Sequence, residues 1–209
     1  MPNSSAELSN ARKKEIVAAC RKLYKTMSYR EITLGEIAEE TSFTRPSIYN
    51  YFETKEEIFL ALFQKEYEEH AADLDRICAE NEALSLDGLA GALARALEKR
   101  QLLLKLQSMN LYDMEENIRM ERLVEFKTAY GASRDALERC LCKFCPELDA
   151  GKRRRFLYAF LPFVFGLYPY ASVTEKQREA MQAAGVPYSY PSAYELAYDG
   201  IKTLLNGLY

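Results

Sequence analysis

Apolar residues recur every three or four positions along most of this chain, which is the spacing of one helix face, and no stretch alternates as a strand does. Proline or glycine breaks the pattern near residues 145–146, 184–187 and 190–191. Beyond residue 63 the pattern predicts helices at 65–81 (continuing one that begins near residue 55), 86–97, 100–112, 115–144, 150–172, 174–184 and 192–208. The expected fold class is therefore all-α.

Two capping-box patterns mark helix starts between residues 33 and 63. Thr33 with Glu36, and Thr54 with Glu57, place a hydroxyl and a carboxylate where they can bind the unpaired N–H groups of a new helix. The pattern predicts that one helix begins at position 34 and another at position 55.

A further short helix is expected between these two. Residues 41–43 have the composition of a tight turn, Thr44 can cap a helix, and Pro46 lacks an N–H group that the first turn would leave unpaired. A helix, a tight turn and a second helix make a helix-turn-helix motif.

The second helix of this motif has one apolar side. Ile48 and Phe52 lie four residues apart and can face a small core. The other arc then carries Arg45, Pro46, Ser47, Tyr49, Asn50 and Tyr51. Guanidinium, hydroxyl, amide and phenol groups donate hydrogen bonds to phosphate oxygens and base edges, so this arc is a candidate DNA-binding surface. A solvated helix with a few surface tyrosines is the alternative.

From Arg12 to Phe63 the sequence resembles the tetracycline-repressor (TetR) family of bacterial transcriptional regulators, most specifically in the run IYNYFETKEEIF at residues 48–59. The resemblance implies a three-helix helix-turn-helix DNA-binding domain at residues 1–60. It also implies a larger helical effector-binding and dimerisation domain at residues 61–209.

The resemblance also assigns roles to single residues of the motif. Thr33 and Thr44 are similar to the family's helix-start hydroxyls that touch phosphates, and Tyr49 to a phenol that contacts the DNA backbone. Lys55 resembles the phosphate clamp that opens the fourth helix. In the family, some positions of this motif vary and face the DNA major groove. By the resemblance, these positions are occupied here by Arg45, Ser47, Asn50 and Tyr51.

The charge of the chain is unevenly distributed, although its net value of −3 is unlike that of a DNA-binding protein. Residues 1–55 carry nine Lys and Arg and seven Glu, which gives a net charge of +2. The remaining residues carry 19 Lys and Arg and 24 Asp and Glu, which gives a net charge of −5. A locally basic domain on an acidic body can dock on DNA in one orientation. No apolar run follows a basic N-terminal segment, so no signal peptide is indicated and a cytoplasmic protein is expected.

An uncharged segment of 18 residues, 156–173, follows four basic residues and could be a membrane span. Pro162 and Pro169 interrupt it, and it barely reaches the minimum length, so a buried helix of a soluble protein is the preferred interpretation. Its apolar residues form two stripes, the first at Phe156, Phe160, Phe163 and Leu167 and the second at Tyr158, Leu161, Phe165 and Tyr168. A helix that is apolar on two sides needs two partners, here its own core and a second subunit.

The final helix carries a similar apolar face after a third capping box, Ser192 with Glu195. In the family, the last two long helices pair with their symmetry mates as a four-helix dimer interface. The expected interface residues are Tyr158, Phe165, Tyr168, Tyr194, Tyr198, Ile201 and Leu205. Such a homodimer would present two recognition helices to a roughly palindromic double-stranded DNA operator.

The family also binds small effectors in the C-terminal domain, which shifts the recognition domains relative to the groove. Candidate pocket residues form an aromatic and methionine-rich set able to repack around an apolar ligand: Met109, Tyr112, Met114, Met120, Phe126, Tyr130, Phe160 and Phe163. Ordinary core packing is the alternative for each of them.

Three of the five cysteines are close in sequence, and Cys140, Cys142 and Cys145 suggest a soft-metal site or an oxidation sensor. On a helix, however, Cys140 and Cys142 point about 200° apart, so they cannot share one metal. Inert cytosolic thiols are preferred, and Cys20 and Cys78 are interpreted in the same way.

Enzyme motifs are absent from the sequence, which contains no phosphate-binding loop, nucleophile elbow, dinucleotide fingerprint or zinc-protease pattern. The single histidine, His70, lies on a charged helix and is expected to be an exposed or domain-facing side chain. The sequence therefore predicts a regulator that is not an enzyme and needs no cofactor or metal. A helical small-molecule or thiol/metal sensor without sequence-specific DNA binding is the alternative.

Overall fold

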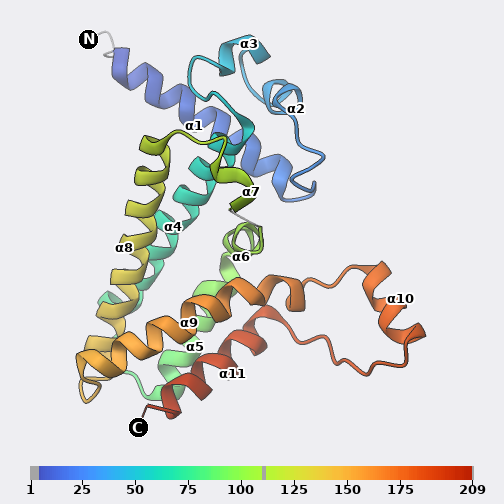
Figure 1. Ribbon diagram of the computed structural model, residues 1–209. Coiled ribbons are helices and arrows are strands. Elements are labelled where there is room, and N and C mark those ends of the chain that lie inside the picture. Colours follow the sequence, from blue (N-terminus) through green and yellow to red (C-terminus); the bar gives the residue numbers. More distant parts are fainter. Residues whose placement is uncertain (1–4, 110–111, 209) are drawn as a thin grey trace. The chain divides into compact units, whose positions relative to one another are not determined.

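The computed structural model describes residues 5–109 and 112–208, except for the side chains of Tyr112 and Asp113. These described residues form helices and no strand, which confirms the expected all-α class (Figure 1). The helices are α1 (Ser5–Tyr24), α2 (Leu34–Glu39), α3 (Arg45–Ile48), α4 (Lys55–Glu80), α5 (Leu86–Lys99), α6 (Gln101–Gln107), α7 (Tyr112–Glu115), α8 (Met120–Phe144), α9 (Ala150–Ala171), α10 (Glu175–Ala183) and α11 (Ala193–Asn206).

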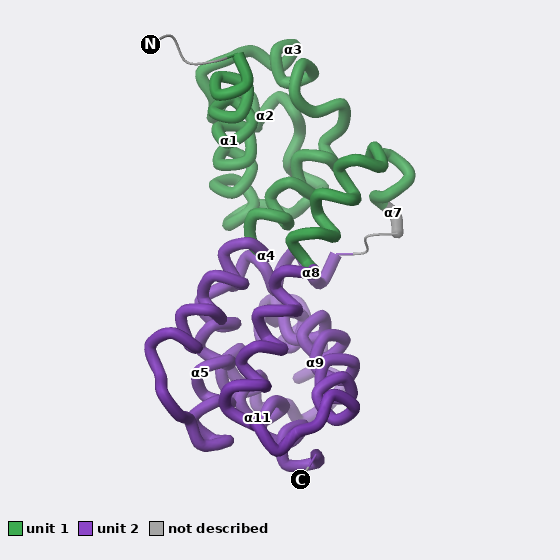
Figure 2. The backbone as a smooth tube through the Cα atoms, turned by 90° about the vertical axis from the view of Figure 1, so that its left-hand side faces the viewer, with its two compact units in different colours: residues 1–66, 110–130 green, residues 67–109, 131–209 purple. Residues whose placement is uncertain are grey.

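The chain divides into two compact units (Figure 2). Unit 1 contains residues 1–66 and 110–130, and unit 2 contains residues 67–109 and 131–209. Helices α4 and α8 each begin in unit 1 and end in unit 2. The predicted boundary after residue 60 did not include the return of residues 110–130 to the N-terminal unit.

The core of unit 1 begins with the apolar face of α1. Ile16, Cys20 and Tyr24 are buried there. The ring of Tyr24 lies edge-on to that of Phe59 on α4, with centroids 5.0 Å apart. Ile48 and Phe52 are 0% and 2% exposed, as their four-residue spacing predicted.

The second part of unit 1 packs against the first turns of α4. Phe63 and Phe126 have ring centroids 5.0 Å apart, and Met114 and Ala129 are also buried. These apolar contacts explain why residues 110–130 belong to this unit although they are distant in sequence from the helix-turn-helix motif.

The core of unit 2 is built mainly by α5, α9 and α11. Helix α11 packs against both α5 and α9, and α6 packs against α9 (Figure 1). Phe156 and Phe160 of α9 stack with centroids 5.4 Å apart and are buried in this core. The predicted helix at 150–172 is confirmed, and it continues through Pro162 and Pro169.

The predicted helices at 100–112 and 115–144 differ most from the structure. Helix α6 ends at Gln107, and α8 begins only at Met120 after the short α7. The N–H of Arg119 donates to the carboxylate of Glu57, 3.3 Å away, and the N–H of Arg122 and Leu123 donate to the Arg119 carbonyl. A side chain from a distant helix therefore fixes where α8 starts, which periodicity along the chain does not reveal.

Within the described ranges, no single helix combines the length and the apolar character needed to cross a membrane. Helices α9 and α10 meet that test only as a joined pair, and that pair is bent by 83°.

Candidate nucleic-acid interface

Helix α2 begins with the predicted capping box. The Glu36 N–H donates to Thr33 Oγ1 at 3.3 Å, and the Thr33 N–H donates to Glu36 Oε2 at 2.6 Å. The reciprocal bonds pair two N–H groups that the first turn leaves unpaired. Thr33 remains exposed, and no described residue accepts a hydrogen bond from its hydroxyl.

The turn between α2 and α3 is attached to α1. Glu15 accepts a 2.6 Å hydrogen bond from the Ser42 N–H, and this bond holds the pKa of the Glu15 carboxyl below its usual range. The Thr41 hydroxyl donates to the Ala38 carbonyl at 2.8 Å. These contacts hold the turn against α1 and against the end of α2.

Helix α3 is a single short turn. Thr44 occupies its N-cap position, but the prediction that the Thr44 side chain caps the helix is wrong. Its hydroxyl lies 3.2 Å from that of Ser47, and Pro46 removes one of the N–H groups that need a cap. The helix ends at Ile48, so Tyr49 and Asn50 lie in the turn that follows it.

The outer arc of this motif carries the predicted polar side chains. Arg45, Tyr49 and Asn50 are exposed, while Ser47 and Tyr51 are half-buried. The side chains of Arg45 and Asn50 make no hydrogen bond or ion pair with any described residue. An exposed guanidinium and an exposed amide without a protein partner can donate to an external anion or base edge.

Lys55 has protein partners in this structure. Its ammonium donates to the carbonyls of Tyr29 and Ile32 at 3.0 and 3.1 Å and lies 3.9 Å from the centroid of the Tyr29 ring. Burial raises the pKa of the Tyr29 phenol, and its hydrogen bond to Glu56 raises it further. Lys55 therefore ties the loop before α2 to the start of α4, and its role as a phosphate clamp stays a prediction.

Only one of the two hydrogen bonds predicted for the capping box at the start of α4 forms. The Glu57 N–H does donate to Thr54 Oγ1, at 3.2 Å. The Glu57 carboxylate, however, does not return to the Thr54 N–H but accepts from the N–H of Glu53, at 2.9 Å. The Thr54 hydroxyl donates in turn to the carbonyl of Asn117, at 2.9 Å.

Glu57 and Arg119 form a bidentate ion pair within unit 1. Arg119 Nε lies 2.6 Å from Glu57 Oε1, and Nη2 lies 2.7 Å from Oε2. Burial raises the pKa of the Glu57 carboxyl, but the hydrogen bonds from Arg119 and the Glu53 N–H outweigh it and hold the pKa below its usual range. The sequence offered no sign of this pair, because its partners are 62 residues apart.

A second set of buried polar side chains lies in unit 2, and it includes the single histidine. Of the two expectations for His70, exposed or domain-facing, the exposed one is wrong, because the side chain is 6% exposed inside this unit. Its Nδ1 lies 2.9 Å from the Ser133 hydroxyl, whereas Nε2 has no partner among the described residues. Burial, with a contribution from Arg100 and against that of Asp73, lowers the pKa of His70 to about 4.

Gln107 is buried beside the same face of α4. Its Nε2 donates to the Tyr67 hydroxyl at 3.2 Å, while its Oε1 is buried without a hydrogen bond from the described residues. Tyr67 and His70 are three residues apart on α4 and therefore share one helix face. Two buried polar atoms thus lack partners in one region of unit 2, which is unusual in a folded protein.

The predicted effector-pocket residues are divided between the units. The aromatic and methionine side chains in unit 1 are Met114, Met120, Phe126 and Tyr130, and those in unit 2 are Met109, Phe160 and Phe163. Met120 is 70% exposed, and its assignment to the pocket stays a prediction. The side chain of Tyr112 lies outside the described residues. For the others the assignment stays a prediction.

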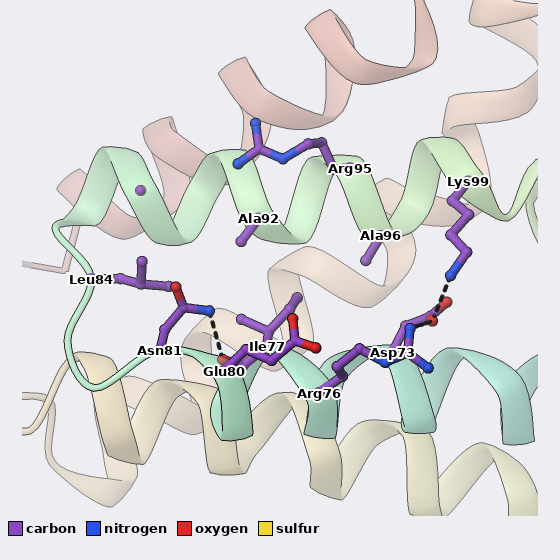
Figure 3. A pocket seen from close by; sticks show the side chains of 11 residues that line it. Asp73, Arg76, Ile77, Glu80, Asn81, Leu84, Ala92, Arg95, Ala96 and Lys99 are labelled. Carbon is purple, nitrogen blue, oxygen red and sulfur yellow. Dashed lines mark hydrogen bonds and ion pairs between the residues drawn. The ribbon is translucent and has the colours of Figure 1, made fainter.

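A surface pocket of about 370 Å³ lies between α4 and α5 in unit 2 (Figure 3). It is lined by Asp73, Arg76, Ile77, Glu80, Asn81, Leu84, Gly88, Ala92, Arg95, Ala96 and Lys99, which include none of the predicted pocket residues. Asp73 accepts hydrogen bonds from Lys99 at 2.9 Å and from Arg76 at 3.0 Å. Its carboxylate is thus occupied by protein donors.

The predicted dimer-interface residues also differ in exposure. Tyr158 is 75% exposed on α9, and Phe165 and Tyr168 are half-buried. Tyr194 and Tyr198 stack on each other with centroids 5.9 Å apart and are half-buried. Ile201 and Leu205 are both 0% exposed in the core of unit 2, so the assignment of these two to a subunit interface is wrong.

Cys140 and Cys142 on α8 point in different directions, as the helix period predicted. Cys140 and Cys145 are buried, whereas Cys142 is exposed, and none of the five cysteines is in a disulfide. Among the described residues, no group of three or more His, Cys, Asp or Glu side chains is arranged to hold a metal ion.

Two protein-family models together match most of the chain. Residues 16–62 match the model of bacterial regulatory proteins of the tetR family. Residues 64–209 match the model of the tetracyclin repressor-like C-terminal domain.

Similar proteins come from several bacteria. A segment of 75 residues, 36% of this chain, is 28% identical to YfiR, an uncharacterised HTH-type transcriptional regulator of Bacillus subtilis, and covers 37% of that relative. A TetR/AcrR-family regulator from Thermobifida fusca has a TM-score of 0.63 at 22% identity, with 94% of this chain and 98% of that chain covered. Thermus thermophilus FadR, a TetR-family repressor solved with lauroyl-CoA, has a TM-score of 0.56 at 16% identity, with 94% and 95% covered. The two structures share the fold of this chain.

Proposed function

Because this chain belongs to the TetR family of DNA-binding transcriptional regulators, which are not enzymes, we propose that it acts as a homodimeric repressor that a small-molecule effector controls. The proposed site of action is a roughly palindromic operator on cytoplasmic DNA. The helix-turn-helix of unit 1 supplies the DNA contacts, and unit 2 supplies the effector site.

The observation that carries this proposal is the unpaired polar arc around α3. Arg45 and Asn50 are exposed without a protein partner, and Tyr49 is 47% exposed beside them. Ile48 and Phe52 anchor the opposite side in the core, which fixes the direction of the arc. Phosphate and base edges are the ligands that match these donors.

The dimer supplies the second recognition helix. Two copies related by a twofold axis would read half-sites about 34–36 Å apart, or multiples of this distance. Tyr158 on α9 is a large side chain that its own protomer leaves uncovered, so it is available for a contact between copies.

To test DNA binding, sequences that the purified full-length protein binds are selected from random duplex DNA. The affinity for the selected sequence is then measured at increasing salt concentrations. We expect an enriched palindrome and an affinity that falls steeply as salt rises, because bound cations are released. The absence of any enriched sequence at low and moderate salt would refute the proposal.

For the effector, we propose that His70 and Gln107 form the polar end of the binding site. Gln107 Oε1 accepts hydrogen bonds only, and neutral His70 can donate or accept at Nε2. A ligand with a hydroxyl or amide donor on an apolar body would pair both atoms and remove the cost of leaving them unpaired. The lauroyl-CoA bound by the Thermus thermophilus repressor supports a small-molecule response, without selecting the same ligand for this chain.

The effector site can be tested before the ligand is known. Compounds extracted from the purified protein by denaturation are identified by mass spectrometry, and hydroxylated aromatic and aliphatic compounds are screened by thermal shift. Any compound that binds is then measured against Gln107→Leu, which removes the acceptor but keeps an apolar chain. We expect at least a tenfold loss of affinity in this variant, and unchanged affinity would place the effector elsewhere.

A further inference from the structure

Two cysteines that are 62 residues apart meet in unit 2. Cys78 Sγ, on α4, lies 3.2 Å from Cys140 Sγ, on α8. Both thiols are free in this structure. The expectation that Cys78 is an inert buried thiol is thus incomplete, because it is half-buried and its sulfur touches a second sulfur.

Polar contacts on both sides of this thiol pair hold α4 and α8 in register. Arg139 binds the Asp75 carboxylate through Nε at 3.0 Å and Nη2 at 2.6 Å. Lys143 donates to the Cys78 carbonyl at 2.7 Å. The two sulfurs therefore lie among polar contacts made by Cys78 itself, by Asp75 on the same helix, and by Arg139 and Lys143 within three residues of Cys140.

The geometry favours bond formation between these two sulfurs. A disulfide needs an S–S distance of about 2.05 Å, so the thiols have to approach by only about 1 Å. Cys140 is 0% exposed, and its Sγ also lies 3.5 Å from the Leu74 carbonyl. Cys78 is the more exposed of the two and is the sulfur that a reagent from solvent reaches first.

We propose that Cys78 and Cys140 are a redox-active pair that a hydroperoxide converts into a reversible intramolecular disulfide. The Cys78 thiol gives up its proton, and the resulting thiolate attacks the peroxide and breaks the O–O bond. Cys78 becomes a sulfenic acid, and the departing hydroxide or alkoxide takes up a proton and leaves as water or an alcohol. The Cys140 sulfur then attacks the Cys78 sulfur, and the S–O bond breaks. The departing hydroxyl takes the Cys140 proton and leaves as water. A dithiol reductant reverses the reaction.

The two thiols have different roles because their surroundings differ. Burial raises the pKa of the Cys140 thiol above its usual range, and the hydrogen bond with Cys78 raises it further. Cys140 is therefore protonated at neutral pH and reacts poorly with peroxide directly. Its position beside Cys78 makes it the resolving thiol.

Trypsin separates the cysteines in a way that makes the test direct. Cleavage after Arg76 and Arg95 places Cys78 alone in peptide 77–95. Cleavage after Arg139 and Lys143 places Cys140 and Cys142 together in peptide 140–143. The full-length Cys142→Ser protein is therefore the starting material, since it removes the exposed thiol and makes the cross-linked peptide unambiguous.

The experiment treats the reduced, folded protein with a small excess of hydrogen peroxide and counts thiols after denaturation. We expect the count in Cys142→Ser to fall from four to two, with peptides 77–95 and 140–143 joined and 2 Da lost. Dithiothreitol should restore both thiols. Cys78→Ser and Cys140→Ser in the same background should give no linked peptide, whereas Cys20→Ser should still give it.

Four unchanged thiols, a link between Cys140 and Cys145, or Cys78 oxidised to a sulfinic acid without a link would each overturn the proposal. If a serine variant does not fold, alkylation of Cys78 in the folded protein before oxidation provides the same test, because the blocked thiol cannot link. The readout is a covalent bond within unit 2, so it is independent of whether the protein binds an operator.

Discussion

The ring of Phe163 on α9 lies directly over the backbone of Gly200 on α11. A Cβ atom built at position 200 would be 2.3 Å from Phe163 Cζ, closer than real Cβ contacts come. The two helices lie side by side in unit 2 (Figure 1), and the missing side chain of Gly200 lets the ring enter the space between them. This contact supports the packing alternative for Phe163, which was also a candidate pocket residue.

Replacing Gly200 by alanine should destabilise the protein although alanine is the better helix former. The added methyl group overlaps an aromatic ring held between two helices, and overpacking of this kind costs about 1–3 kcal/mol. Urea unfolding of the Gly200→Ala variant measures the loss.

Gly166, on α9, provides the matched control. It is also inside a helix, but a Cβ added there would meet nothing within 4 Å. Gly166→Ala should therefore be neutral or stabilising, by up to about 1 kcal/mol. Adding Phe163→Leu to Gly200→Ala should recover part of the lost stability, because the smaller side chain makes room for the new methyl group. If the double variant instead loses the sum of the unfolding free energies lost by the two single variants, the proposed overlap is contradicted.

Glu57→Gln should lower the free energy of unfolding by about 2 kcal/mol at pH 7, because it removes the carboxylate that binds Arg119. The folded pKa of Glu57 lies below its ordinary value of 4.5, so the ionised group stabilises the folded state above that pH. This contribution is lost as the pH falls through the folded pKa. Urea unfolding at pH 7 and pH 4 should show a difference between wild type and variant that shrinks in acid.

Glu125→Gln is the control for this prediction. Glu125 pairs with Arg122 at 2.8 Å, but its side chain is 49% exposed, and exposed pairs contribute about 0–1 kcal/mol. An equal effect of the two substitutions would mean that burial of Glu57 has no energetic consequence.

Local patterns in the sequence predicted the helices well because helix starts depend on neighbouring residues. The boxes at Thr33 and at Ser192 form as expected, each with the reciprocal bond of its partner three residues on. The half-wrong box at Thr54 shows the limit of this reasoning. Arg119 competes for the Glu57 carboxylate, and only the folded chain brings the two together.

Periodicity also identifies an apolar face without identifying what covers it. Ile201 and Leu205 were correctly placed on the apolar face of the last helix, but that face meets α5 and α9 of the same protomer. The contact between Cys78 and Cys140 is another non-local feature, since no sequence pattern near either cysteine predicts that it contacts the other.

The pH dependence of stability between pH 7.5 and 5.5 should come mainly from His70. The chain has one histidine, and its pKa is lowered from 6.5 to about 4 in the folded protein. Because the unfolded chain takes up the proton first, stability should fall by about 1 kcal/mol as the pH drops across this range. His70→Asn, which keeps a polar group beside Ser133, should remove most of this slope.

The NMR signal of the single histidine ring gives an independent measurement. Its resonances in the folded wild type should stay unchanged from pH 7.5 to 5.5, because the ring remains neutral. A titration with a midpoint near 6.5 would show that His70 is in contact with solvent, contrary to its 6% exposure.

Arg45→Ala should weaken binding to the selected operator by about 1–3 kcal/mol, or roughly 5- to 150-fold, without changing thermal stability. Arg45 is exposed and bonds to no described residue, so its loss leaves the fold intact. Arg155→Ala, at an exposed position of α9, removes the same charge from unit 2 and should change affinity little. Equal losses in both variants would indicate a general charge effect instead of a contact.

The Lys55→Met substitution tests DNA binding less directly than the position of Lys55 in the motif suggests, because Lys55 also has partners within the protein. Its ammonium holds the Tyr29 and Ile32 carbonyls, so removing it should lower both operator affinity and stability. Comparing the melting temperature with the affinity of this variant separates the two roles. Unchanged stability would show that the two carbonyl contacts contribute nothing measurable.

Tyr158→Glu should convert the proposed dimer into a monomer with little change in the stability of the protomer. The side chain is 75% exposed within its own protomer, and a buried unpaired carboxylate at a subunit contact is strongly unfavourable. Size-exclusion chromatography with light scattering measures the mass. Tyr170→Glu, at a 61% exposed tyrosine of the same helix outside the predicted interface, should remain dimeric.

Leu205→Ala separates the core from the interface on the neighbouring helix. Leu205 is 0% exposed, so its truncation leaves a cavity and should cost about 2–5 kcal/mol of unfolding free energy. The variant should still be a dimer under conditions where it is folded, because the side chain does not reach the surface. A folded monomeric Leu205→Ala protein would show that the core face of α11, and not the exposed face of α9, controls association.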